Sequence, residues 1–294
     1  MVSTNNNFNI KQLTVIGVGL IGGSLARALR EAQVVDQIVG CGLNKDHLQQ
    51  AIDLDVIDKY ETDVAKAVKG SELIVVAVPV GAMEAVFQQI KTAADSQAVI
   101  TDVGSTKGSV VQAVGNAYGE VPAHFVPGHP IAGTEKSGVE ASFAGLFHHR
   151  RVLLTPLNQT DTAAVEKVTR MWQATGAIVS TMDVDHHDDV LAATSHLPHL
   201  LAFALVDTLA TLDEKAEIFQ YAAGGFRDFT RIASSEPQMW HDICVNNRQA
   251  ILNILKRFET DLARLGKAIA DNDSNYILDV FKRAKASRDQ FSHK

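Results

Sequence analysis

Residues 13–24 read LTVIGVGLIGGS, so Gly17, Gly19 and Gly22 directly follow a β-branched run and open a segment of helical period. In this pattern the first glycine permits a tight turn, the second lets the backbone approach a pyrophosphate, and the third lets helix and strand pack closely. The N-terminus of the helix adds unpaired N–H groups and a positive dipole. We therefore expect a dinucleotide here; the alternative is that the glycines serve only a turn. The expected cofactor-binding residues of this segment are Gly17, Val18, Gly19, Leu20, Ile21 and Gly22.

Beyond this segment, short β-branched runs alternate with helical segments, which is typical of a parallel sheet covered by helices. Continuous apolar runs such as IVVAV (74–78) indicate strands buried on both faces. Strands are predicted at Leu13–Gly17, Gln37–Gly42, Leu73–Val78, Ala98–Val103, His124–Val126, Arg151–Thr155 and Ala177–Met182. Helices are predicted at Leu20–Gln33, Asp46–Ile52 and Val80–Thr92. The predicted fold class is α/β, an N-terminal Rossmann-like, mostly parallel sheet.

After Met182 the β pattern stops and only helical periodicity remains. Helix starts are predicted at Asp185, Asp213 and Pro237. One long helix over Asp242–Ile269 carries an apolar stripe that a compact half-domain could hardly bury alone, so we expect an all-α C-terminal dimerisation domain and a homodimer. The expected boundaries are residues 1–183 for the dinucleotide-binding domain and 184–294 for the helical substrate and dimerisation domain.

Composition narrows the class of protein. The 294 residues are 46% hydrophobic, and 27 basic residues stand against 34 acidic ones with no basic block, which argues against nucleic acid and anionic lipid as partners. Cys41 and Cys244 have neither disulfide nor metal spacing, and no secretory signal opens the chain, so we expect a reducing cytoplasm. The apolar stretch Leu197–Leu212 is interrupted by polar residues, and we expect a buried helix there rather than a membrane span.

The end of the second predicted strand reads CGLNK (41–45), without the acidic residue that would bind the ribose 2′-hydroxyl of NAD. Gly42 leaves room for a 2′-phosphate that Asn44 or Lys45 could reach, but no arginine marks NADP. NAD is the expected cofactor and NADP stays open. Val78 and Pro79, at the end of another strand, are further expected cofactor contacts.

Two polar segments follow later strands, at the sheet edge where α/β proteins place their ligands. In TDVGSTKG (101–108), Ser105 and Lys107 are candidate site groups; alternatively Ser105 caps a helix and Lys107 is solvated. In the loop GHPIAGTEKSG (128–138), His129 is a candidate general base or hydrogen-bond acceptor, although a lone histidine is often structural.

Two further segments are unusual in a hydrophobic domain. SHLPH (195–199) breaks an apolar helix with two imidazoles, and GGFRDFTR (224–231) places two guanidinium groups beside glycines. A kinked core helix and a surface pair of arginines around Asp228 are the plain interpretations. Arginine that binds a carboxylate at a domain cleft is the functional one. The histidines of HH (148–149) and DHHDD (185–189) lack H-E-x-x-H spacing, so we expect solvated turns and helix starts, and no metal site.

With VIGVGLIGGS, TDVGSTKG, GHPIAGTEKSG, SHLPH and GGFRDFTRIA in this order, nearly the whole chain resembles the prephenate and arogenate dehydrogenases of tyrosine biosynthesis, also called cyclohexadienyl dehydrogenases. The resemblance implies oxidative decarboxylation: hydride leaves C4 of a cyclohexadienyl ring for NAD(P)⁺, CO₂ is lost, and the ring becomes aromatic. It further implies a small-molecule substrate and tyrosine competing at the active site.

Position by position, the resemblance assigns roles. His129 matches the catalytic histidine that hydrogen-bonds the C4 hydroxyl of the substrate and accepts its proton. Ser105 matches the serine that helps to orient this histidine, the hydroxyl and the nicotinamide of the cofactor. Arg231 matches the arginine that binds the ring carboxylate, and His199 and Thr134 match substrate-pocket positions. Glu135, Arg227 and Asp228 resemble an ionic network that controls access to the substrate pocket.

Two departures and two rivals remain. The absent acid at Gly42 leaves NAD preference open, and Arg227 stands where lysine or arginine is expected. No regulatory domain is expected after the helices and no fused mutase before the first strand. A β-hydroxyacid or imine-reductase type of dehydrogenase is disfavoured because no lysine occurs between Lys167 and Lys215. A catalytically silent dinucleotide-sensing protein is the alternative of another class.

Overall fold

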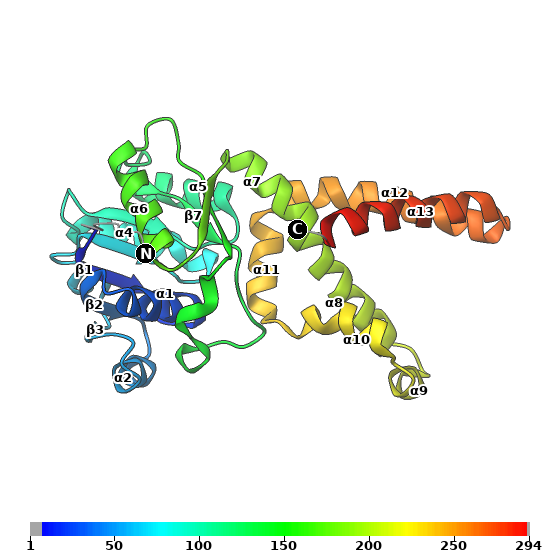
Figure 1. Cartoon of the computed structure of the whole chain (residues 1–294), viewed down its shortest axis with the longest axis horizontal. Helices are drawn as coiled ribbons and strands as arrows, with labels where there is room; N and C mark the ends of the chain where they lie inside the picture. The colour runs from blue at the N-terminus through cyan, green and yellow to red at the C-terminus, as the bar shows by residue number, and fades with distance from the viewer. Residues whose placement is uncertain (1–7, 293–294) are drawn as a thin grey trace, which may run out of the picture. The chain divides into compact units, whose positions relative to one another are not determined.

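The computed structural model describes residues 8–292, and the chain divides into two compact units at Arg248 (Figure 1). The first unit contains nine strands: β1 (Ile10–Ile16), β2 (Val35–Cys41), β3 (Lys59–Glu61), β4 (Leu73–Val76), β5 (Val99–Asp102), β6 (Phe125–Val126), β7 (Gly128–Pro130), β8 (Arg151–Leu154) and β9 (Ile178–Thr181). Its helices are α1 (Leu20–Glu31), α2 (Lys45–Asp53), α3 (Val64–Ala67), α4 (Met83–Ala93), α5 (Lys107–Tyr118), α6 (Thr162–Ala174), α7 (Val184–Leu191), α8 (Leu197–Ala210), α9 (Lys215–Gln220), α10 (Gly224–Thr230) and α11 (Pro237–Asn246). The second unit is formed by α12 (Arg248–Ala270) and α13 (Ser274–Ser292).

The main sheet has six parallel strands in the order β3-β2-β1-β4-β5-β6. The chain starts at β1, builds outward to β3, and then crosses back to β4 on the other side of β1. The carboxyl ends of β1 and β4 therefore meet where the strand order reverses, with Ile16 paired to Val76. This switch point is where open α/β sheets bind ligands. The predicted Rossmann-like fold is confirmed.

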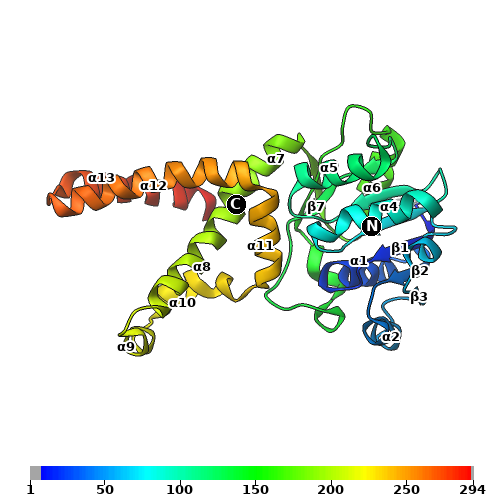
Figure 2. The same cartoon turned by 180° about the vertical axis from the view of Figure 1, so that it is seen from behind.

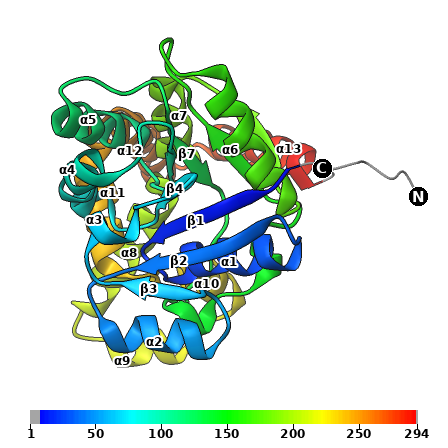
Figure 3. The ribbon, with the colours of Figure 1, turned by 90° about the vertical axis from the view of Figure 1, so that its left-hand side faces the viewer.

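The sheet separates two cores, as the continuous apolar strands predicted. Leu13 and Val15 of β1 point to the face covered by α1 and α6, where Trp172 is fully buried. Ile16 points to the opposite face, where α3, α4 and α5 lie and Phe87 is buried (Figure 3). The central strands β4 and β5 thus bury both of their faces, which holds the sheet rigid beneath the loops at its carboxyl end.

Two predicted strands lie outside the main sheet. β8 and β9, predicted from residues 151–155 and 177–182, form a second sheet with β7, in which β7 and β8 run antiparallel. Neither β7 nor β3 was predicted, because three residues are too short to show a period. Gly128–Pro130 was expected to be part of a loop, so this expectation was wrong for His129. The histidine sits on a strand, paired with Leu153.

The apolar helix of the helical part is longer than predicted. α7 starts at Val184, and a π-helical turn, Ala192–His196, joins it to α8, so one helical stretch runs from Val184 to Ala210. Pro198 has no N–H to bond the carbonyl four residues before it, and the wider turn absorbs this gap. By length and composition, this is the one stretch among residues 8–292 that could cross a membrane, and 28% of its apolar 18-residue window is buried. The expectation of a buried helix was wrong for the single chain.

The predicted single helix over Asp242–Ile269 was also wrong, because the helix breaks at Asn247. This residue ends α11 with its backbone out of helical geometry, and its buried side chain bonds to groups on other elements. In the second unit, α13 doubles back along α12 (Figure 2). Apolar side chains of this unit remain exposed at Leu252, Leu262, Ile269, Leu278 and Phe281.

Candidate active site

The glycine-rich turn has the predicted geometry. Gly17 adopts φ +98°, and a Cβ there would lie 2.3 Å from the carbonyl oxygen of Ala77. A Cβ on Gly22 would lie 2.2 Å from the carbonyl oxygen of Gly17, whereas one on Gly19 would meet nothing within 4 Å. Gly17 and Gly22 are thus required by close packing, and Gly19 leaves open space at the start of α1. No side chain caps α1 and no acidic residue lies in its first turn, so its amides fit an anionic pyrophosphate.

A cavity of about 770 Å³ in the first unit gathers most of the predicted site residues. It reaches from the glycine-rich turn, past the ends of β4, β5 and β7, to the π-helical turn and α11. Among its lining residues are Gly19, Leu20, Ile21, Val78, Pro79, Ser105, His129, Thr134, Glu135, His199 and Arg231. The predicted residues that do not line it are Gly17, Val18, Gly22, Asn44, Lys45, Arg227 and Asp228.

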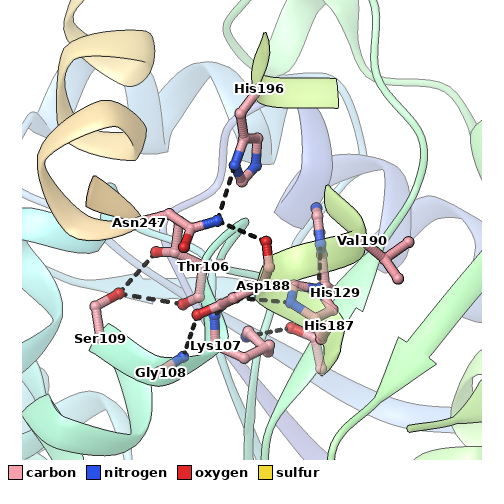
Figure 4. Close-up of polar contacts among 12 residues, drawn as sticks. Thr106, Lys107, Gly108, Ser109, His129, His187, Asp188, Val190, His196 and Asn247 are labelled. Atoms are coloured by element: carbon pink, nitrogen blue, oxygen red, sulfur yellow. Dashed lines mark hydrogen bonds and ion pairs between the residues drawn. The ribbon is translucent and has the colours of Figure 1, made fainter. Parts of the chain in front are cut away.

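His129 is buried beside this cavity and is held from behind by α7. Its Nδ1 lies 2.9 Å from Nε2 of His187, and Nδ1 of His187 lies 2.8 Å from Oδ1 of Asp188 (Figure 4). Burial, and then the nearby His187 and Lys107, hold the pKa of His129 well below its usual value. The expectation that the 185–189 cluster is solvated was therefore wrong for His187, which has no exposed side chain; the expected helix start was correct.

Ser105 lines the same cavity, but within residues 8–292 its hydroxyl has no hydrogen-bond partner, and the group bonded to His129 is His187. The α5 cap is Thr106 rather than Ser105, so the capping alternative was wrong. Lys107 was expected either in the site or in solvent, and it is in neither. It is fully buried, and its Nζ donates to Asp102 Oδ2 at 2.5 Å and to the Gly128 carbonyl at 2.6 Å.

This buried ion pair positions the two segments that carry Ser105 and His129. Asp102 also accepts the amide hydrogens of Gly104 and Gly128, at 2.7 and 3.1 Å. One carboxylate and one ammonium group thus fix the start of the Ser105 segment and the strand that carries His129. Because both charges are paired and hydrogen-bonded, their burial is tolerated.

Two imidazoles, His196 of the π-helical turn and His199 of α8, also line the cavity. His199 donates from Nδ1 to the Ser195 carbonyl at 2.9 Å and stacks on Trp240, with ring centroids 3.6 Å apart. His196 is buried, and its Nδ1 accepts from Nδ2 of Asn247 at 3.1 Å. Burial lowers the pKa of His196 to about 4. Burial also lowers the pKa of His199, so both rings are neutral near pH 7 and offer hydrogen bonds rather than charge.

The guanidinium group of Arg231 opens onto the cavity and forms an ion pair with Glu135. The side chain of Arg231 is 63% exposed, so a ligand carboxylate could exchange with Glu135. Arg227 and Asp228 are exposed on α10, and neither forms an ion pair in the described part of the chain. The predicted ionic network is thus present in this structure only as the Arg231–Glu135 pair.

At the predicted ribose end, Asn44 is the N-cap of α2. Its side-chain oxygen accepts the amide hydrogens of Asp46 and His47, at 2.8 and 3.2 Å. That oxygen is therefore not available to a cofactor, which leaves the exposed Lys45 as the cation nearest in sequence to Gly42. A Cβ on Gly42 would come no closer than 3.5 Å to its nearest neighbour, the Leu48 side chain, so space remains beside this glycine.

Sequence reasoning missed four residues around the cavity: His187, Asp188, Trp240 and Asn247. Their hydrogen bonds and ring contacts join segments up to 81 residues apart, so no local spacing signals them. No group of three or more His, Cys, Asp or Glu side chains within residues 8–292 is arranged to hold a metal ion. His148 and His149 are exposed, as predicted.

Comparison with known proteins places this geometry in a family. A family model described as the prephenate dehydrogenase nucleotide-binding domain matches residues 25–181, and one described as the prephenate dehydrogenase dimerization domain matches residues 183–283. The chain belongs to the prephenate dehydrogenase family. A cyclohexadienyl dehydrogenase of Zymomonas mobilis is 38% identical and covers 95% of this chain and 95% of its own length. A prephenate dehydrogenase of Bacillus subtilis is 34% identical over 94% of this chain and 75% of its own length.

Solved structures of the family agree with the fold. A prephenate dehydrogenase from A. aeolicus, crystallised with hydroxyphenyl propionate and NAD⁺, superimposes with a TM-score of 0.91 at 34% identity. The match covers 97% of this chain and 100% of that one. Synechocystis arogenate dehydrogenase, at 23% identity and a TM-score of 0.80, covers 95% of this chain and 99% of its own, and shares the fold.

Proposed function

We propose that this chain catalyses the oxidative decarboxylation of prephenate or arogenate in tyrosine biosynthesis, with hydride transfer to NAD⁺. The observation that carries the proposal is the cavity that His129, Arg231 and the start of α1 share. A glycine-rich turn for a dinucleotide, a buried neutral imidazole and an exchangeable arginine are the groups that this reaction needs. The family of the chain supports the same reaction.

The residues of the chain divide the work. NAD⁺, when bound, supplies the hydride acceptor. The unpaired amides at the start of α1 bind the pyrophosphate, and Val78 and Pro79 line the cavity beside it. Arg231 releases Glu135 and binds the ring carboxylate, which fixes the ring in the cavity. His129 accepts the hydroxyl proton from C4, which favours departure of the hydride.

Other cavity residues position the substrate. His199, held against Trp240, and Thr134 offer hydrogen-bonding groups to it. Ser105 offers its unpartnered hydroxyl beside His129. Tyrosine, which shares the aromatic ring of the product, would compete for the same cavity.

Further proposals concern the chain as a whole. Residues 1–183 serve the cofactor and 184–294 serve substrate binding and dimerisation, and the dimer is a homodimer in the cytoplasm. The exposed apolar residues of α12 and α13, and the half-exposed α8, support a second copy of the chain as the partner. The match to a dimerization-domain model over residues 183–283 supports the same partner.

The deciding experiment measures initial rates of NAD⁺ and NADP⁺ reduction by the purified chain, each with prephenate and with arogenate. Turnover with at least one pair is expected, and the ratios report substrate and cofactor preference. The open space at Gly42 and the nearby Lys45 predict measurable rates with NADP⁺ as well. Binding of NADH without turnover in any combination would instead indicate a silent dinucleotide-sensing protein.

A further inference from the structure

A line of three hydrogen-bonded side chains runs from the cavity into the protein interior (Figure 4). It begins at His129 on β7, passes through His187 and ends at Asp188, both on α7. His187 is fully buried, so water does not compete for these bonds. The exposed neighbours on the same helix, His186 and Asp189, make no such contacts within the described residues.

The end of this line is rigidly held. Oδ1 of Asp188 accepts the amide hydrogen of Lys107 and Oδ2 accepts that of Gly108, both at 2.8 Å, at the first turn of α5. The Asp188 carbonyl accepts from Nδ2 of Asn247 at 2.8 Å. Burial by itself favours the neutral acid, but the bonds from His187 and the two amides outweigh it and hold the pKa of Asp188 below its usual value. The carboxylate is therefore charged and only accepts hydrogen bonds.

This anchor fixes the tautomer of both rings. Because the Asp188 carboxylate only accepts, Nδ1 of His187 carries a proton, and Nε2 of the neutral ring accepts. His129 must then donate from its own Nδ1, which leaves Nε2 of His129 unprotonated. A base at this position needs that free nitrogen.

We propose that His187 and Asp188 are positioning residues that hold His129 in the tautomer with Nε2 unprotonated and disperse the charge that it gains. The proposal rests on the role of His129 given above. When Nε2 of His129 takes the proton of the substrate hydroxyl, the Nδ1 proton shifts to Nε2 of His187, and the O–H electron pair stays on the substrate oxygen. The positive charge then lies beside the Asp188 carboxylate. The reverse shift returns the proton to the ring oxygen once loss of CO₂ makes the ring aromatic.

Nitrogen-15 NMR of the histidine-labelled protein tests the tautomer directly. The signals of His129 are identified as those missing from His129→Asn. We expect a protonated Nδ1 and an unprotonated Nε2 in the unsubstituted protein, and a mixture of both tautomers in His187→Gln. If Nε2 of the neutral His129 ring is protonated in the unsubstituted protein, the proposal is overturned, whatever the variants show.

Kinetics with matched neighbours tests the effect on catalysis. His187→Gln and Asp188→Asn should lower kcat by at least about tenfold, a part of what general base catalysis contributes, with KM for substrate and cofactor within about twofold. His186→Gln and Asp189→Asn, on the exposed side of the same helix, should keep kcat within about twofold.

The outcomes separate this proposal from the function on which it rests. If His129→Asn abolishes turnover while folded His187→Gln and Asp188→Asn keep the full kcat, the positioning role is wrong and the role of His129 stands. If His129→Asn itself keeps full activity, the proposed role of His129 fails and the positioning role fails with it. Thermal melting of each variant, compared with its neighbour control, separates loss of folding from loss of positioning.

Discussion

In the proposed mechanism, His129 uses a ring nitrogen and not a charge, because burial holds the pKa of its imidazole well below its usual value. His129→Asn keeps a polar side chain of smaller size but removes the base. We expect kcat to fall by about 100- to 10,000-fold, the usual contribution of general base catalysis, with KM little changed. Steady-state rates check this, with His148→Asn on the surface as control. A higher KM with an unchanged kcat in His129→Asn would contradict the assignment.

In the proposed mechanism, Arg231 binds the ring carboxylate through charge and geometry; its partner in this structure is Glu135. Arg231→Gln should raise KM for the substrate about 10- to 100-fold, the value of one hydrogen bond to a charged group, and should change kcat less. The matched control is Arg150→Gln, at an exposed arginine outside the cavity. The prediction fails if the two variants raise KM equally.

At the scale of elements, the buried pair of Lys107 and Asp102 joins α5, β5 and β7. Lys107→Met leaves the carboxylate buried without its ammonium partner, so the free energy of unfolding should fall by about 3–5 kcal/mol. Urea denaturation measures this loss. Lys69→Met, at an exposed lysine, should change stability by no more than about 0.5 kcal/mol. If Lys107→Met lost as little stability as Lys69→Met, the ion pair would not be what holds the Ser105 and His129 segments in place.

The elements that the sequence predicts are those whose causes lie close together in the chain. The glycine-rich turn and the doubly buried strands were found because their causes are local: a tight turn at Gly17, and apolar runs that pack on two faces. The helix break at Asn247 and the buried His187 were missed because distant groups cause them. Asn247 leaves the helix to bond Asp188, 59 residues away, and His187 is buried where α7 packs against α5. In sequence, both resemble ordinary polar positions on amphipathic helices.

At the scale of the whole molecule, buried neutral histidines link folding to pH. Burial lowers the pKa of His129, His187 and His196 below their usual value near 6.5, that of His196 to about 4. Below about pH 6.5 these histidines therefore bind protons in the unfolded chain but not in the folded chain, so the free energy of unfolding falls as the pH falls. The melting temperature should drop between pH 7 and pH 5, and less so in His196→Gln than in a His148→Gln control. A melting temperature that rises or stays level over this range would contradict the coupling.

The assembly is also a property of the whole chain. Leu262 on α12 and Phe281 on α13 are 55% and 56% exposed, and apolar area of this kind is costly unless another surface covers it. Sedimentation equilibrium should give about twice the chain mass of 31.8 kDa at micromolar concentration, because a second copy offers the same apolar faces.

The double substitution Leu262→Asp and Phe281→Asp should shift the protein toward monomer, since each carboxylate would have to lose its water in the interface. Glu259→Gln, exposed on α12, serves as the control and should leave the dimer intact. Because the glycine-rich turn lies in the first unit, NADH binding should survive the double substitution. A monomeric unsubstituted chain would refute the dimer. Flotation of that chain with lipid vesicles would instead assign the apolar stretch Val184–Ala210 to a membrane.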